Sequence, residues 1–169
     1  TLVGIDPVTT DVIFTFKSNV LDTHKFAKFI KTFFTTYCPR SILAMERNSY
    51  GWGVLSELVD EETGIPNNIL YVPLSEAQIK KGEFGSRGNT TAGIFTLKPM
   101  RDRLFKGILG SRVQQFTMLM RSEDIYNEIC TLEEKNGRID HKNGAHDDLL
   151  IAFAIGIYTI SDLYEYVLR

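Results

Sequence analysis

The C-terminal segment sets the strongest limit on what this chain can fold into. From about Asp147 to Val167, apolar residues occupy most sides of a predicted helix until Ser161, so other elements must surround that helix. Its most apolar stretch, Leu149 to Ile157, has nine residues, well short of the about 20 that span a bilayer. We therefore expect a soluble domain built around one buried helix, with no membrane association.

Short β-rich segments precede this helix. Thr1–Ile5 and Val12–Phe16 are separated by turn residues and predict an antiparallel hairpin. The apolar runs Ile42–Met45 and Ile69–Val72 predict strands covered on both faces. A further strand is predicted over Val113–Met120.

Helical spacing of apolar residues predicts four more helices between these strands. Their start signals are Asp22, Ser49, Pro99 and Ser122. The apolar residues at helical spacing in the first are Phe26, Phe29, Ile30, Phe33, Phe34 and Tyr37. The second is predicted to have Trp52, Leu55 and Val59 inward, and the fourth Ile125, Ile129 and Leu132. The third, with Met100, Leu104 and Ile108, is predicted to be a basic amphipathic helix. Pro73–Thr91 is predicted to be a loop, and Arg138–Gly144 a turn or small hairpin. The order predicts an α/β fold, a mixed sheet flanked by helices on both faces.

Composition favours one ordinary intracellular domain over residues 1–169. The chain has 169 residues and a net charge of −2, which excludes a histone-like polycation. Cys38 and Cys130 lie far apart in the sequence, so neither a zinc cluster nor a disulfide framework is indicated. The N-terminal residues do not form a secretory signal.

Charge is distributed unevenly along the chain. Lys80–Arg112 holds eight basic and two acidic residues, whereas Glu123–Asp148 holds eight acidic and three basic ones. This pattern suits a protein that holds a polyanion near a cation-binding acidic cluster, although two solvated helix faces explain the charges more simply. The predicted DNA-contacting residues are Lys80, Lys81, Arg87, Lys98, Arg101, Arg103 and Lys106. We expect their contacts to be weak, sequence-tolerant and sensitive to salt.

Carboxylates occur in two unusual settings. Glu46 ends an apolar predicted strand, where α/β sheets collect ligands; an ion pair with Arg47 is the structural alternative. His146-Asp147-Asp148 directly precedes the apolar helix, and two adjacent acids there exceed what helix capping needs. One of the two acids is expected to be carried inward.

A cluster of these carboxylates would suit divalent cations. Like charges held together repel one another unless a cation neutralises them. Mg²⁺ and Mn²⁺ prefer oxygen ligands, and two such ions about 4 Å apart catalyse phosphodiester hydrolysis.

Three sequence strings resemble the nuclease domain of the large terminase subunit of tailed bacteriophages. These are VIFTFKSNVLDTHKFAKFI, AMERNSYGWGVL and NGAHDDLLIAFAIG, which occur in the family's order and spacing across nearly the whole chain. The resemblance implies an RNase H-like fold and a two-metal Mg²⁺- or Mn²⁺-dependent endonuclease. Its substrate would be concatemeric double-stranded viral DNA, cut during genome packaging in the host cytoplasm. It implies Glu46 and Asp148 as metal ligands, with Asp147 as a neighbour or alternative ligand.

The resemblance also implies partners, and the sequence departs from the family's pattern at several points. The implied partners are an ATPase domain, a small terminase subunit and a portal, but no GxxxxGK[ST] motif occurs, and GEFGSRG lacks the lysine. The family's first catalytic Asp lies on a first strand that this chain is expected to lack, and Asp6 is a weak candidate for that role. His146 is expected to orient water or the leaving group, or to serve as a hydrogen-bonded residue at the helix start.

Two other functions remain open at this stage. Another RNase H-like enzyme, such as a resolvase or transposase core, would use the same carboxylate chemistry. A non-catalytic DNA-binding or docking module would explain the missing first Asp.

Overall fold

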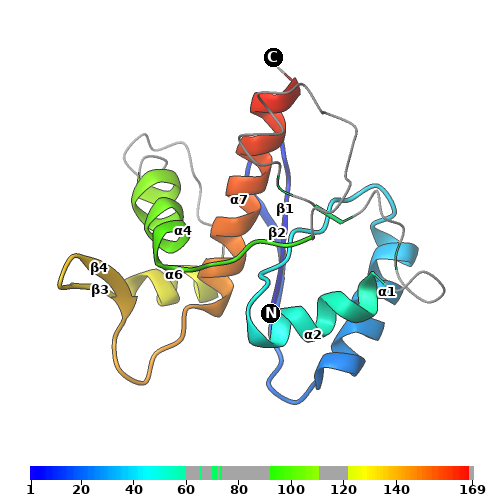
Figure 1. Ribbon diagram of the computed structural model, residues 1–169, viewed down its shortest axis with the longest axis horizontal. Helices are drawn as coiled ribbons and strands as arrows, with labels where there is room; N and C mark the ends of the chain where they lie inside the picture. The colour runs from blue at the N-terminus through cyan, green and yellow to red at the C-terminus, as the bar shows by residue number, and fades with distance from the viewer. Residues whose placement is uncertain (60–64, 66–69, 72, 74–91, 111–121, 168–169) are drawn as a thin grey trace. The chain divides into compact units, whose positions relative to one another are not determined.

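The computed structural model describes residues 1–59, 65, 70–71, 73, 92–110 and 122–167 (Figure 1). The chain forms two compact units. The first unit comprises Thr1–Asn19 and Thr96–Arg169, and the second comprises Val20–Phe95.

The first unit opens with the predicted antiparallel hairpin. β1 (Leu2–Ile5) pairs with β2 (Val12–Phe16), and Leu2 lies opposite Phe16. The Asp6 carboxylate organises the connecting turn, because its Oδ1 accepts the backbone N–H groups of Val8 at 2.7 Å and Thr9 at 3.0 Å. The hairpin prediction is therefore confirmed.

The long helix α7 (Asp148–Val167) is the centre of the first unit and packs against β1 (Figure 1). Six of its apolar side chains are almost completely buried: Leu149, Leu150, Phe153, Ala154, Ile155 and Ile157. The prediction of a buried C-terminal helix is confirmed. Among the described residues, no helix is long and apolar enough to cross a membrane.

The basic helix of the first unit has two parts. α4 (Lys98–Asp102) carries Pro99 in its first turn, and a π-helical segment, η1 (Arg103–Leu109), follows without a break. Leu104, Phe105 and Leu109 are buried, and η1 packs against α7. A basic amphipathic helix is therefore present, as predicted.

The helix α6 (Glu123–Cys130) begins as predicted but ends earlier. The Ser122 side chain caps it by accepting the Ile125 backbone N–H. Leu132, predicted to lie on this helix, is instead the first residue of β3 (Leu132–Lys135).

A second antiparallel hairpin replaces the rest of that predicted helix. β3 pairs with β4 (Arg138–His141), so the hairpin starts well before the predicted turn at Arg138–Gly144. Asn136 and Gly137 both have positive φ, 53° and 74°, as the tight turns favoured by Asn-Gly require. The local turn chemistry overrides the helical spacing that reaches Leu132.

The second unit contains two packed helices. α1 (Thr23–Tyr37) is capped as predicted, because Asp22 Oδ1 accepts the Lys25 backbone N–H at 2.8 Å. Ile30 and Phe34 are buried, whereas Tyr37, the last residue of the apolar spacing, is exposed at the C-terminal end of the helix.

The helix α2 (Ser49–Leu58) corrects three details. Its N-cap residue is Asn48, because Ser49 already has helical geometry. Leu55 is buried as predicted, but Trp52 and Val59 are exposed, since Val54 and Leu58 share the inward face with Leu55. The apolar spacing identified the helix, but assigned two residues to the wrong face.

Where the second unit is described, the residues of its predicted strands form isolated parallel bridges. Leu43 bridges Leu70, and Glu46 bridges Ile94. Ile42 is about half exposed rather than covered on both faces. Predictions for residues 69, 72, 74–91 and 113–120 lie outside the described residues. Over the described part, the chain is mixed α/β, with two small antiparallel sheets.

Candidate functional site

The two acids at the start of α7 lie in different environments. Asp147 is buried and directly precedes α7, and its carbonyl oxygen accepts the Ile151 backbone N–H at 2.8 Å, as that of an N-cap residue does. Asp148 and His146 are exposed. One acid is carried inward, as expected, and it is Asp147.

Arg101 neutralises the buried acid. Its guanidinium is bonded to the Asp147 carboxylate, and its Nη2 also lies 3.2 Å from Asp140 Oδ1 on β4. Its Nε donates to the Ile139 carbonyl at 3.4 Å, and the guanidinium lies 4.9 Å from the Phe105 ring centroid. These contacts connect α4, β4 and the start of α7 through one side chain, which is only 12% exposed.

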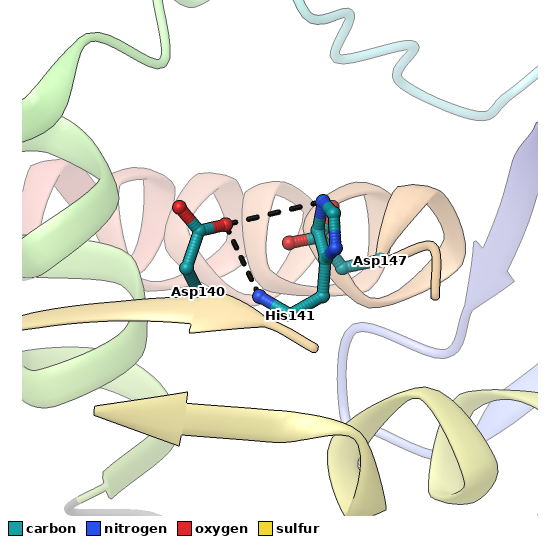
Figure 2. Close-up of side chains that lie close together, drawn as sticks. All are labelled: Asp140, His141 and Asp147. Carbon is teal, nitrogen blue, oxygen red and sulfur yellow. Dashed lines mark hydrogen bonds and ion pairs between the residues drawn. The ribbon is translucent and has the colours of Figure 1, made fainter. Parts of the chain in front are cut away.

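Asp140, His141 and Asp147 form a compact cluster. Figure 2 shows the side chains of Asp140 and His141, from β4, beside that of Asp147 at the start of α7. One possible ligand atom from each lies within 4.8 Å of the other two. Carboxylate oxygens and imidazole nitrogens are donors that bind divalent cations. Arg101 bonds to both acids, and Arg138 Nη2 lies 3.1 Å from Asp140 Oδ2. Arginine charge thus already compensates this cluster.

Glu128 is a second buried acid beside α7. On α6, it accepts the Leu150 backbone N–H through Oε2 at 2.8 Å, and its Oε1 lies 3.0 Å from Lys17 Nζ. The carboxylate therefore stabilises an N–H group in the first turn of α7, where no carbonyl of the same helix is available.

Glu128, Asp140 and His141 are not among the predicted site residues. A signal for Glu128 exists, because it lies three residues after the buried Ile125, on the inward side of α6. Asp140 and His141 gave no comparable local signal, since their positions follow from the β3–β4 pairing.

Glu46 lies in the second unit, beside the start of α2. It bridges Ile94, and its Oε1 accepts the Asn48 side-chain amide at 3.0 Å. Gly51 packs so closely that a Cβ there would strike the Glu46 carbonyl oxygen. Because Glu46 and Asp148 belong to different units, their pairing stays a prediction.

Asp6, the weak candidate for a ligand, is used in the β1–β2 turn. Backbone hydrogen bonds from Thr9 and Val8 hold the pKa of its carboxyl below the ordinary value. This geometry gives Asp6 a structural role.

The predicted DNA-contacting cations are in different settings. Lys98 is exposed, whereas the Arg101 side chain is mostly covered and ion-paired. The Arg103 guanidinium lies 5.1 Å from the Tyr158 ring centroid, and Lys106 donates to the Gly137 carbonyl at 2.9 Å. The remaining three, Lys80, Lys81 and Arg87, lie outside the described residues.

The comparisons with known proteins add no relative. No protein-family model matches this chain, and a search of the curated proteins finds no match to it.

Proposed function

We propose that this chain is the nuclease domain of a large terminase subunit, a Mg²⁺- or Mn²⁺-dependent DNA endonuclease with an RNase H-like fold. Support comes from the order of the Glu46 string and the His146-Asp147-Asp148 string, and from the mixed α/β composition of the described residues. The proposed substrate is double-stranded DNA, cleaved during packaging in the host cytoplasm. The proposed partners are the ATPase domain, the small subunit and the portal of such a machine.

The observation that carries the proposal is that the two adjacent acids lie in different environments. Asp147 is buried and neutralised by Arg101, whereas Asp148 is exposed at the start of a buried helix. An exposed carboxylate on a rigid element is available to a divalent cation, while a buried, paired one is not without losing its partner. We therefore assign Asp148 and Glu46 as the ligands and Asp147 as a supporting neighbour.

The donor chemistry fits Mg²⁺ or Mn²⁺, since both proposed ligands supply carboxylate oxygens. When bound, a divalent cation supplies an activated water and neutralises charge on the phosphate and leaving oxygens. The chain's own residues would fix the position of Asp148: Arg101 holds Asp147, and Glu128 holds the first turn of α7. His146 is exposed beside Asp148, in a place to orient water or the leaving group.

The alternative of a non-catalytic DNA-binding module has one specific observation in its favour. The Asp6 carboxylate is used in the turn between β1 and β2, which leaves the role of the family's first catalytic Asp unfilled among the proposed ligands.

Another RNase H-like nuclease would use Glu46 and Asp148 in the same way.

Cleavage of supercoiled plasmid separates the enzyme from the module. We expect loss of the supercoiled form with Mg²⁺ or Mn²⁺ and none with EDTA. DNA binding without cleavage under any of these conditions would favour the non-catalytic module.

A further inference from the structure

Arg47 lies close to two exposed aromatic rings in the second unit. Its guanidinium carbon is 3.9 Å from the Phe95 ring centroid and 5.7 Å from that of Trp52. Trp52 is 51% exposed and Phe95 46% exposed. Rings packed only for core stability are mostly buried, and here Val54, Leu55 and Leu58 fill the core beneath α2.

Backbone pairing fixes this arrangement. The Ile94 N–H donates to the Met45 carbonyl at 2.7 Å, and the Arg47 N–H donates to the Ile94 carbonyl at 2.8 Å. These two bonds hold Phe95 beside Arg47. Trp52 lies in the first turns of α2, five residues after Arg47. The two rings and the guanidinium are thus mounted on paired backbone and on a helix, which makes the surface preorganised.

We propose that Arg47, Trp52 and Phe95 form a stacking surface for an unpaired base of single-stranded DNA. Every base presents a π-face, so aromatic rings bind single strands with little sequence preference. The guanidinium interacts favourably with both rings and places a positive charge beside them, complementary to the phosphate of the stacked nucleotide. The choice of DNA as the ligand class rests on the proposed function; the stacking surface rests on the three side chains.

The chain contains a single tryptophan, so Trp52 fluorescence reports directly on this surface. The wild-type protein is titrated in EDTA with a single-stranded oligothymidylate of about 12 nucleotides, and separately with a duplex of the same length. We expect the single strand to quench Trp52, and the duplex to quench it weakly, since its bases are already stacked. Equal quenching by both, or none by either, would overturn the proposal.

Substitutions separate stacking from charge. Phe95→Ala should weaken oligothymidylate binding about 10-fold, and Arg47→Lys should also weaken it while leaving the salt dependence unchanged, because the charge remains. Because Trp52→Ala removes the single tryptophan, the affinity of that variant is measured by the fluorescence anisotropy of a labelled oligonucleotide. If Phe95→Ala fails to fold, as judged by circular dichroism, Phe95→Leu replaces it and should show the same loss of affinity.

Tyr50→Ala is the matched control. Tyr50 is 79% exposed and lies two residues before Trp52 on α2, about 200° around the helix. Its removal should leave the affinity unchanged, and a loss equal to that of Phe95→Ala would contradict a specific surface.

The outcome also separates this inference from the proposed function. Plasmid cleavage without single-strand quenching would refute the stacking surface alone. Strong quenching without metal-dependent cleavage would refute the nuclease and leave the stacking surface in place.

Discussion

The Glu128 carboxylate accepts the backbone N–H of Leu150, with 2.8 Å between Oε2 and the nitrogen. Leu150 lies in the first turn of α7, directly after the exposed Asp148 and the buried Leu149. A side chain from α6 thereby fixes the part of α7 that carries the proposed metal ligand.

Removing this carboxylate should loosen the start of α7. We expect Glu128→Ala to lower the free energy of unfolding by about 1–3 kcal/mol, because the Leu150 N–H loses its partner while buried. Glu128→Gln should cost less, since an amide oxygen still accepts the bond. Glu123→Gln, an exposed change on the same helix, is the control and should cost at most about 1 kcal/mol.

Amide hydrogen exchange separates this effect from general destabilisation. In Glu128→Ala, the Leu150 amide should lose protection, while the Ile151 amide, bonded to the Asp147 carbonyl, should retain it. Unchanged protection at Leu150 would show that Glu128 does not fix the start of the helix.

Arg101→Met should leave Asp147 as an uncompensated buried acid. Asp140 keeps its contact with Arg138, so most of the cost falls on Asp147, and we expect a loss of about 3 kcal/mol at neutral pH. The double variant Arg101→Met/Asp147→Asn should recover much of that loss. Urea unfolding of the two single variants and the double variant measures the coupling. Additive losses would mean that the pair does not act as a unit.

Gly51→Ala should disturb Glu46 without changing any polar group. A Cβ at Gly51 would strike the Glu46 carbonyl oxygen, whereas one at Gly53 would lie 3.3 Å from the Thr23 methyl group. Both changes gain about 1 kcal/mol of helix propensity, but the clash at Gly51 should outweigh that gain. We expect Gly51→Ala to lower both stability and plasmid cleavage, and Gly53→Ala to leave cleavage unchanged. Normal cleavage by Gly51→Ala would argue against a role for Glu46.

The α1 cap should contribute a pH-dependent part of stability. The Lys25 backbone N–H bonded to Asp22 holds the pKa of that carboxyl below its ordinary value of 3.8. The folded state therefore binds the proton less readily than the unfolded state, so this stabilisation is present above that ordinary value. It is lost as the pH falls through the lower folded pKa.

Urea unfolding of the wild type and Asp22→Ala tests this dependence. The wild type should be the more stable at about pH 6, and the difference should shrink well below pH 4. A difference that does not change with pH would assign the cap to uncharged hydrogen bonding alone.

Elements with strong local signals could be predicted from the sequence. The β1–β2 hairpin, the Asp22 cap of α1 and the buried face of α7 all follow from spacing and turn residues within one segment. The β3–β4 hairpin had a local signal too, Asn136-Gly137, but the apolar spacing up to Leu132 suggested a longer helix. The helical spacing and the turn residues favour different structures there, and the chain adopts the hairpin that the turn residues favour.

The surroundings of the site could not be predicted in the same way. Arg101 was predicted to contact DNA because it lies in the basic segment Lys80–Arg112. Its actual partners, Asp140 and Asp147, lie 39 and 46 residues away. Whether a charge faces solvent or a buried acid depends on such long-range packing, which composition and spacing do not encode.

The central claim is tested most directly by plasmid cleavage with Mn²⁺. The rate at which the supercoiled form disappears is compared between the wild type and the variants Glu46→Ala and Asp148→Ala. We predict that each substitution lowers cleavage at least about 100-fold. Each variant should stay as stable as the wild type without metal, or become more stable, because removing one acid relieves like-charge repulsion. Asp124→Ala, which removes an exposed acid on α6, should cleave normally. Full cleavage by either Glu46→Ala or Asp148→Ala would contradict the assignment of these carboxylates as metal ligands.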